Sequence, residues 1–229
     1  MIDNTNWEFI RKIEEGYECS TNVLYVPTIS PEKDKMCMHF TEDAAEYMRG
    51  SCVPRNNELM ETFFQRELKY LTIFQGKPWC PEIFDVDTTE RKILVEFNKE
   101  SLNKPIRIEG RSLDSEFPNW KQDLFRIIKD VHDSGYIKSS LYPHCFFYTN
   151  SGQMKMIDYY ATIEKDDTLL HKSLIEPIIG VDSHQRFVEV KQGDYYQMGN
   201  HFKNSLKTWI KWPGDPLPEF FDMIFGNNE

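Results

Sequence analysis

Two stretches of the chain carry apolar residues at the spacing of one helical face. The first covers residues 56–75 and stops at Gly76, with Pro78 shortly beyond; the second covers residues 119–135 and stops at Gly135. Asn119 stands where a helix N-cap is expected. The apolar positions are Met60, Phe64, Leu68 and Leu71 in the first stretch, and Trp120, Leu124, Ile127, Ile128 and Val131 in the second. The pattern predicts two amphipathic helices.

Shorter apolar runs bounded by turn residues predict strands. Residues 7–26 indicate a hairpin around Gly16, and residues 36–40 form a third short run. Two further strands, residues 81–86 and 92–97, flank a polar turn. An aromatic run at residues 146–148, the turn 149–152 and a second strand leading to Asp158 predict another hairpin.

The strands gather before Asn98 and the helical pattern dominates after it. We therefore expect an α+β fold in which a twisted antiparallel sheet carries one helix, followed by a mainly helical part that meets it near Asn98. Residues 99–118 are polar, contain Pro105 and Gly110, and are interpreted as a connection.

Composition narrows the classes of partner. The 229 residues include 27 basic and 37 acidic side chains, a net charge of −10, and no long Lys and Arg cluster, so neither nucleic acid nor a membrane surface is an expected partner. Five scattered cysteines without a C-x-x-C pair favour neither a disulfide framework nor a zinc site. No secretory leader or apolar span is evident, so we expect a cytoplasmic protein, in the host cytoplasm if it is viral.

The region from Gly135 to Tyr160 contains the pattern with most chemical meaning. A helix ends, a loop closes at Pro143, an aromatic strand follows, and a second strand ends in Ile157-Asp158-Tyr159-Tyr160. This order resembles the catalytic core of protein kinases, in which the loop reads His-Arg-Asp-Leu-x-x-x-Asn and the second strand ends in Asp-Phe-Gly. The matching positions are Lys138, Ser139, Ser140 and Leu141 for the first four loop residues, Cys145 for the Asn, and Asp158 for the metal-binding Asp.

The same resemblance extends to the first part of the chain and assigns residues around a nucleotide. It implies a bilobal kinase-like fold, with a small N-lobe at residues 1–98 and a truncated, mainly helical C-lobe at residues 99–229. His39 falls on the strand lysine, with Lys35 as the alternative register, although a lone strand-end His is more often merely half-buried. The candidate nucleotide-binding residues are Gly16 of the first turn, His39, the helix glutamate Glu67, the gatekeeper Val95, the hinge residues Glu96 and Phe97, and Cys145.

The resemblance also shows what is missing. Ser140 replaces the catalytic Asp, and its hydroxyl, with a pKa far above neutrality, cannot accept the substrate proton as a carboxylate does. This favours a pseudokinase that binds or regulates a protein partner and needs no cofactor. The alternative is an atypical phosphotransferase using ATP and Mg²⁺, with Asp158 as metal ligand and His144 or Asp133 in a positioning role.

Two further interpretations stay open at this point. One is a small-molecule-binding or structural module of another fold. The other concerns origin, because Ser-Leu-Tyr-Pro-His together with Ile-Asp-Tyr-Tyr-Ala resembles small kinase-like proteins of tailed bacteriophages.

Overall fold

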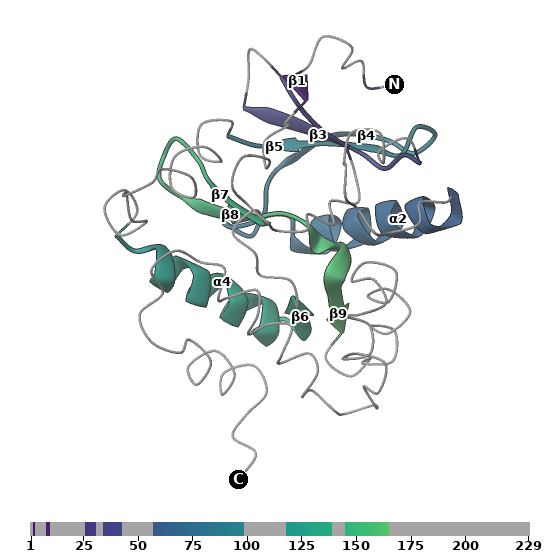
Figure 1. Ribbon diagram of the computed structural model, residues 1–229. Helices are drawn as coiled ribbons and strands as arrows, with labels where there is room; N and C mark the ends of the chain where they lie inside the picture. The colour runs from purple at the N-terminus through teal and green to yellow at the C-terminus, as the bar shows by residue number, and fades with distance from the viewer. Residues whose placement is uncertain are drawn as a thin grey trace, which may run out of the picture.

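Two helices and three small antiparallel sheets make up the part of the chain that the computed structural model describes (Figure 1). The described residues are 2, 8–9, 26–30, 34–42, 57–98, 118–138 and 145–164. The architecture is α+β, as predicted. Neither helix within these ranges is long and apolar enough to cross a membrane.

The largest sheet has five antiparallel strands in the order β1-β2-β3-β5-β4. Strand β3 is central and pairs with β2 on one side and β5 on the other. The Asp87 carboxylate accepts hydrogen bonds from the backbone N–H groups of Thr89 and Glu90, which fixes the turn between β4 and β5. The strands are β1 (Glu8–Phe9), β2 (Val26–Ile29), β3 (Lys35–His39), β4 (Ile83–Asp87) and β5 (Lys92–Glu96).

The boundaries of several strands differ from the sequence prediction, among them β2 and β3. Strand β2 runs through Pro27, which was expected to begin a polar connection, and β3 starts one residue earlier than expected. The sheet accommodates this proline because β1 is only two residues long and pairs with Thr28 and Ile29, not with Pro27. The turn around Gly16 lies outside the described residues.

Helix α2 (Asn57–Phe74) lies beside this sheet (Figure 1). Its buried face includes three of the four predicted positions and is wider than predicted, because Phe63, Glu67, Tyr70 and Phe74 are buried as well. Met60, Phe64 and Leu71 are fully buried, while Leu68 packs partly buried against the same core. Gly76 follows the helix with a backbone φ of +85°, a conformation that glycine adopts without strain.

Helix α4 (Trp120–Asp133) buries the five apolar residues that the sequence predicted for its inner face. Asn119 occupies the N-cap position, but its side chain makes no capping hydrogen bond, so only its backbone carbonyl accepts from the first turn. The helix ends before Gly135, which has a φ of +89°.

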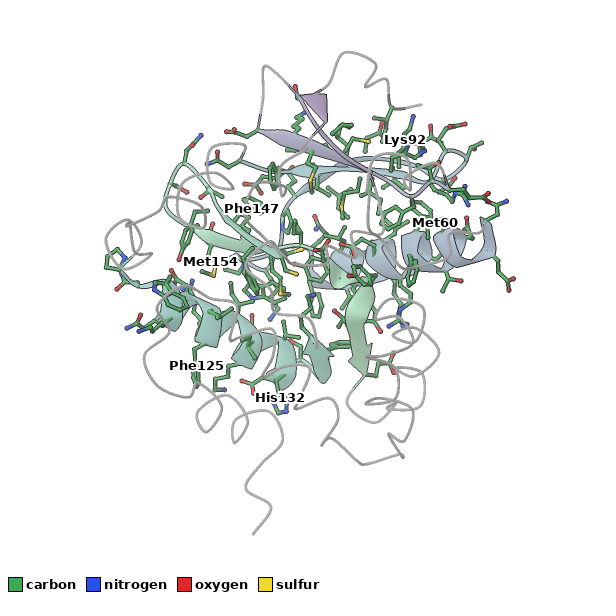
Figure 2. The ribbon with its side chains drawn as sticks, viewed as in Figure 1. Met60, Lys92, Phe125, His132, Phe147 and Met154 are labelled. Carbon is green, nitrogen blue, oxygen red and sulfur yellow. The ribbon has the colours of Figure 1, made fainter. Side chains whose placement is uncertain are left out.

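After α4 the chain forms two further strand pairs and a short 3-10 turn. Strand β6 (Tyr136–Lys138) pairs with β9 (Thr162–Glu164), and β7 (Phe146–Tyr148) pairs with β8 (Met154–Met156) as the predicted hairpin. The 3-10 turn η3 (Tyr159–Ala161) connects β8 to β9. Figure 2 shows the side chains, among which Met60, Phe147 and Met154 are buried.

A polar contact ties the loop after α2 to α4. The Asp130 carboxylate accepts hydrogen bonds from Lys77 Nζ at 2.9 Å and from Trp79 Nε1 at 2.7 Å. Burial raises the pKa of Asp130, but these hydrogen bonds outweigh burial and hold the pKa below its usual value. The carbonyl of Trp79 also accepts from Met156 N at 2.9 Å, so one loop contacts both α4 and β8.

We expect Asp130→Ala to destabilise the protein by about 2 kcal/mol, because the buried Trp79 N–H then loses its acceptor. Asp133→Ala is the matched control, since Asp133 is exposed on the same helix and pairs only with Lys129 four residues away. Its effect should stay below about 0.5 kcal/mol. Urea unfolding measures both changes, and equal effects would contradict this account.

Candidate functional site

Asp158 lies just after β8 in an unusual backbone conformation. Its φ of 64° and ψ of 50° are left-handed, and the only other described non-glycine residue with a positive φ is Arg91. Aspartate adopts this conformation more readily than most residues, and such positions cluster at functional sites. The residue is only 3% exposed.

Cys145 and Asp158 lie together, at the positions that the kinase resemblance gives to the two metal-binding side chains. The Cys145 thiol donates to Asp158 Oδ2 across 3.4 Å, and Ile157 N donates to the Cys145 carbonyl at 2.7 Å. The hairpin register, with Phe146 opposite Met156, produces this neighbourhood. The juxtaposition follows from local hairpin geometry, which is why sequence reasoning could anticipate it.

This pair of side chains is a poor fit to Mg²⁺. Magnesium requires hard oxygen ligands in near-octahedral geometry, whereas Cys145 offers only a soft sulfur atom, whose hydrogen is donated to Asp158. Among the described residues, no group of three or more His, Cys, Asp or Glu side chains is placed to hold a metal ion. The carboxylate is used internally, as the acceptor for Cys145.

Glu67, on α2, contacts the segment that follows Asp158. Its Oε2 accepts a hydrogen bond from Tyr160 N at 2.7 Å, and the side chain is fully buried. The adjacent Arg66 donates through Nε to the Tyr160 carbonyl at 2.9 Å and through Nη2 to the Thr162 carbonyl. Two consecutive helix residues therefore hold both the donor and the acceptor of the Tyr160 backbone.

The environment of Glu67 favours its neutral form. Burial, and after it the negative charge of Asp158, raises the pKa of Glu67 to about 8. Backbone hydrogen bonds from Tyr159 and Tyr160 and the positive charge of Lys138 lower the pKa, but by less. At neutral pH the protonated carboxyl still accepts from Tyr160 N, so the contact between α2 and the Asp158 segment does not require a charge.

His39 does not face Glu67, which corrects the register that placed it on the strand lysine. Met36 and Met38 belong to the core shared with α2, and Cys37, although fully buried, does not. Side chains alternate along a strand, so His39 lies on the face opposite to Met38. The alternative, Lys35, is on that opposite face too, with its ammonium 4.2 Å from the centre of the Phe84 ring. The strand residue facing α2 is Met38.

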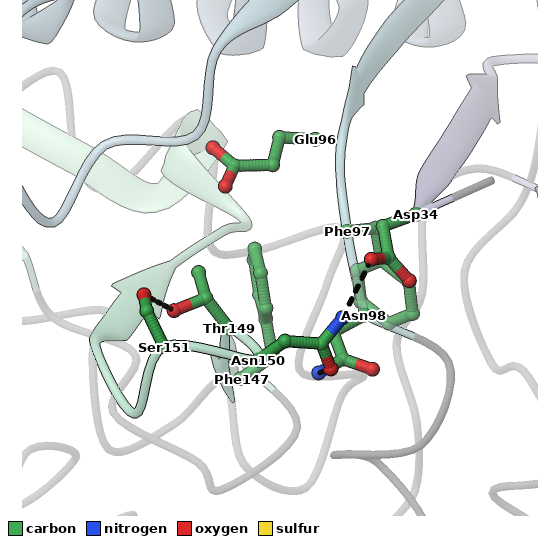
Figure 3. Close-up of a pocket in the computed structure, with 8 residues that line it drawn as sticks. All are labelled: Asp34, Glu96, Phe97, Asn98, Phe147, Thr149, Asn150 and Ser151. Atoms are coloured by element: carbon green, nitrogen blue, oxygen red, sulfur yellow. Dashed lines mark hydrogen bonds between the residues drawn. The ribbon is translucent and has the colours of Figure 1, made fainter.

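The predicted hinge borders a cavity of about 290 Å³ (Figure 3). Phe97 N donates to the Asp34 carbonyl at 2.9 Å, and the rings of Phe97 and Phe147 lie 5.0 Å apart. Glu96 forms an ion pair with Lys155, and Val95 is fully buried. The lining residues are Asp34, Glu96, Phe97, Asn98, Phe147, Thr149, Asn150 and Ser151, so neither Cys145 nor Asp158 borders this cavity.

A chain of amide hydrogen bonds at this cavity was not predicted. Asn98 Nδ2 donates to the Tyr148 carbonyl at 2.9 Å and to Asn150 Oδ1 at 3.0 Å, and Asn150 Nδ2 donates to Asp34 Oδ2 at 2.9 Å (Figure 3). The chain joins three segments that are remote in sequence, and no local motif marks it.

The remaining site residues from the sequence fall elsewhere. Gly16, Ser140 and His144 lie outside the described residues, so their assignments stay predictions.

Comparisons with known proteins were made on the whole chain. No family model matches it, and no curated protein matches it. Among solved structures, it is similar to monomeric WbdD, with 14% identity and a TM-score of 0.45 over 74% of this chain and 39% of that one. A second, described as the bifunctional kinase-methyltransferase WbdD, gives 12% identity and a TM-score of 0.42 over 95% of this chain and 50% of that one.

The chain spans half or less of the length of these WbdD structures. Two features of its site matter most: a buried carboxyl pair that the protein uses for its own hydrogen bonds, and a strand that presents methionine where the kinase resemblance implies lysine.

The raised pKa of Glu67 predicts a pH dependence of stability. Between about pH 4.5 and 8 the folded state holds a proton on Glu67 that the unfolded chain releases, so the contribution of Glu67 to stability is greatest below pH 4.5 and falls as pH rises toward 8. Glu67→Gln should remove this pH dependence, which amounts to a fall in the free energy of unfolding of up to about 1.4 kcal/mol per pH unit. Urea unfolding at pH 5 and pH 8 should show the variant gaining on the wild type at the higher pH.

Glu61→Gln is the matched control for this measurement, because Glu61 is exposed on the same helix. It should follow the wild-type pH dependence. If Glu67→Gln also runs parallel to the wild type, burial does not perturb Glu67 as described.

Two buried cysteines should be inert in the folded protein. Burial raises the pKa of Cys37 and of Cys80 to about 11, so little thiolate forms at neutral pH. We expect both to be alkylated only when the chain unfolds, whereas an exposed thiol reacts at once. Peptide mass spectrometry after iodoacetamide treatment, with and without urea, tests this; rapid native labelling of either residue would contradict it.

Proposed function

We propose that this chain is a catalytically impaired, kinase-like protein that acts by binding or regulating a protein partner instead of transferring phosphate. In this proposal residues 1–98 form a small N-lobe and residues 99–229 a truncated C-lobe. The five-stranded antiparallel sheet and α2 before Asn98, with α4 after it, support the division.

The observation that carries the proposal is the residue that β3 presents toward α2. In the kinase resemblance a lysine there binds phosphate and pairs with the helix glutamate. Met38 provides neither a charge nor a hydrogen-bond donor, and Glu67 bonds to the backbone of Tyr160 instead. The lysine that would bind phosphates is thus absent, and the glutamate that would position it is engaged with the backbone of Tyr160.

The electrostatics of the hinge cavity also disfavour a nucleotide. Asp34 and Glu96 place two carboxylates on its lining, and only Glu96 is paired with a cation in the described residues, namely Lys155. A triphosphate near these groups would be repelled. The serine at position 140, in place of the catalytic base, is a further argument against phosphate transfer.

One observation favours the alternative, a phosphotransferase that uses Asp158. The left-handed conformation of Asp158 has a free-energy cost, and such conformations often persist because a function requires them. An active enzyme would have to free this carboxylate from its hydrogen bond with Cys145.

Nucleotide binding distinguishes the two functions. A ligand at a hundred times its dissociation constant stabilises a fold by about 2.7 kcal/mol, which raises the melting temperature of a chain of this size by roughly 5–10 °C. We expect millimolar ATP with Mg²⁺ to give a shift well below this range, and no ADP production above the buffer control. The measurements are differential scanning fluorimetry and a coupled ADP assay.

Asp158→Asn and Asp85→Asn serve as paired variants, because both remove one carboxylate and only the second lies on the surface. A shift of 5–10 °C that Asp158→Asn abolishes and Asp85→Asn preserves would replace the pseudokinase proposal with the phosphotransferase one.

A further inference from the structure

Lys138 is a buried lysine. It is the last residue of β6, and the whole side chain is only 2% exposed. Its ammonium makes no hydrogen bond with any described residue. Moving an ammonium out of water costs several kcal/mol unless opposite charge compensates it, so a lysine in this position needs an explanation.

The strand register places Lys138 beside the segment that α2 binds. Lys138 is opposite Thr162 in the β6–β9 pair. The carbonyl of Thr162 accepts from Arg66, and Tyr160 N, two residues earlier, donates to Glu67. Lys138 therefore approaches residues 158–162 from β6, while Arg66 and Glu67 approach the same residues from α2.

Two buried carboxyl groups lie at the segment that Lys138 approaches, because Asp158 begins it and Glu67 accepts a hydrogen bond from Tyr160 N. Asp158 and Lys138 are the two charged residues that act on the Glu67 carboxyl, with opposite effects. Glu67 Oε1, like Lys138 Nζ, is buried without a hydrogen bond to a described residue, although Oε2 is bonded. Two buried carboxyl groups and one buried ammonium thus occupy one region, and the ammonium compensates negative charge that would otherwise be uncompensated.

We infer that Lys138 is the counter-ion of the buried Glu67–Asp158 carboxyl pair and, through it, a positioning residue that holds residues 158–162 against α2. The cation comes from β6, because β3 presents Met38 on that side. This role does not depend on whether the protein binds nucleotide, so its test is independent of the ATP measurements.

A double-mutant cycle between Lys138 and Glu67 tests the inference. Unfolding by urea is measured at pH 9, where the Glu67 carboxyl carries its charge, for Lys138→Met, Glu67→Gln and the double variant. Methionine keeps the apolar stem and removes the ammonium. In the wild-type background we expect Lys138→Met to raise the unfolding equilibrium constant on the order of 100-fold. In the Glu67→Gln background the same substitution should raise this constant by a factor that is smaller by about tenfold or more.

Lys69→Met is the matched control, because Lys69 is an exposed lysine on α2 that pairs with Glu164. It should show no coupling to Glu67→Gln. If Lys138→Met does not fold, the double variant should recover folding. Additive effects of Lys138→Met and Glu67→Gln, or a double variant as unstable as Lys138→Met alone, would overturn the inference.

The alkylation rate of Cys145, compared with the rate that global unfolding allows, provides a second measurement. A general loss of stability alone does not change this comparison. Its thiol is fully buried and donates to Asp158. If Lys138 positions Asp158, then Lys138→Met should let iodoacetamide reach Cys145 at least about tenfold faster than global unfolding allows. Lys69→Met should leave the rate at the wild-type value. Labelling of Cys145 that simply tracks global unfolding in Lys138→Met would reject the positioning role.

Discussion

The hydrogen bond from Tyr160 N to Glu67 is the contact on which the arrangement of the site depends. It is 2.7 Å long, it is buried, and it joins α2 to the turn that carries Asp158. A buried backbone N–H has to find an acceptor inside the protein, and the helix supplies one. Arg66, one position earlier, satisfies the neighbouring carbonyls. Because these bonds are made to backbone groups, they fix the path of the segment whatever side chains it carries.

The sequence predicted the helices better than the strands, for a physical reason. A helix of 14 or 18 residues repeats its apolar face through several turns, so the inner residues of α4 and part of those of α2 could be identified from spacing alone. In a five-residue strand that is buried on both faces, apolar and polar positions do not alternate, so the two faces cannot be told apart from the sequence. In β3 the residues Met36, Cys37 and Met38 are all buried, so the pattern could not tell which face met α2 and left the register open between His39 and Lys35.

The candidate site could be predicted only where local geometry produces it. Cys145 and Asp158 meet because a short hairpin connects them, and the helix pattern located Glu67. The burial of Lys138 and the hydrogen bond between Asn150 and Asp34 depend on pairings between distant segments, the latter across 116 positions of sequence. Nothing in the residues next to Lys138 distinguishes a buried lysine from the exposed lysines elsewhere in the chain.

The way charge is distributed in the site bears on what the fold can do. In the kinase resemblance, a strand lysine joins the helix glutamate to the phosphates, so the position of the helix and the presence of ligand are connected. Here α2 is held by backbone groups of Tyr160 and Thr162, and by a lysine from β6 on our inference. Every partner in this set belongs to the protein itself. In the pseudokinase that we propose, the helix and the Asp158 segment would therefore need no nucleotide to keep the arrangement that a protein partner recognises.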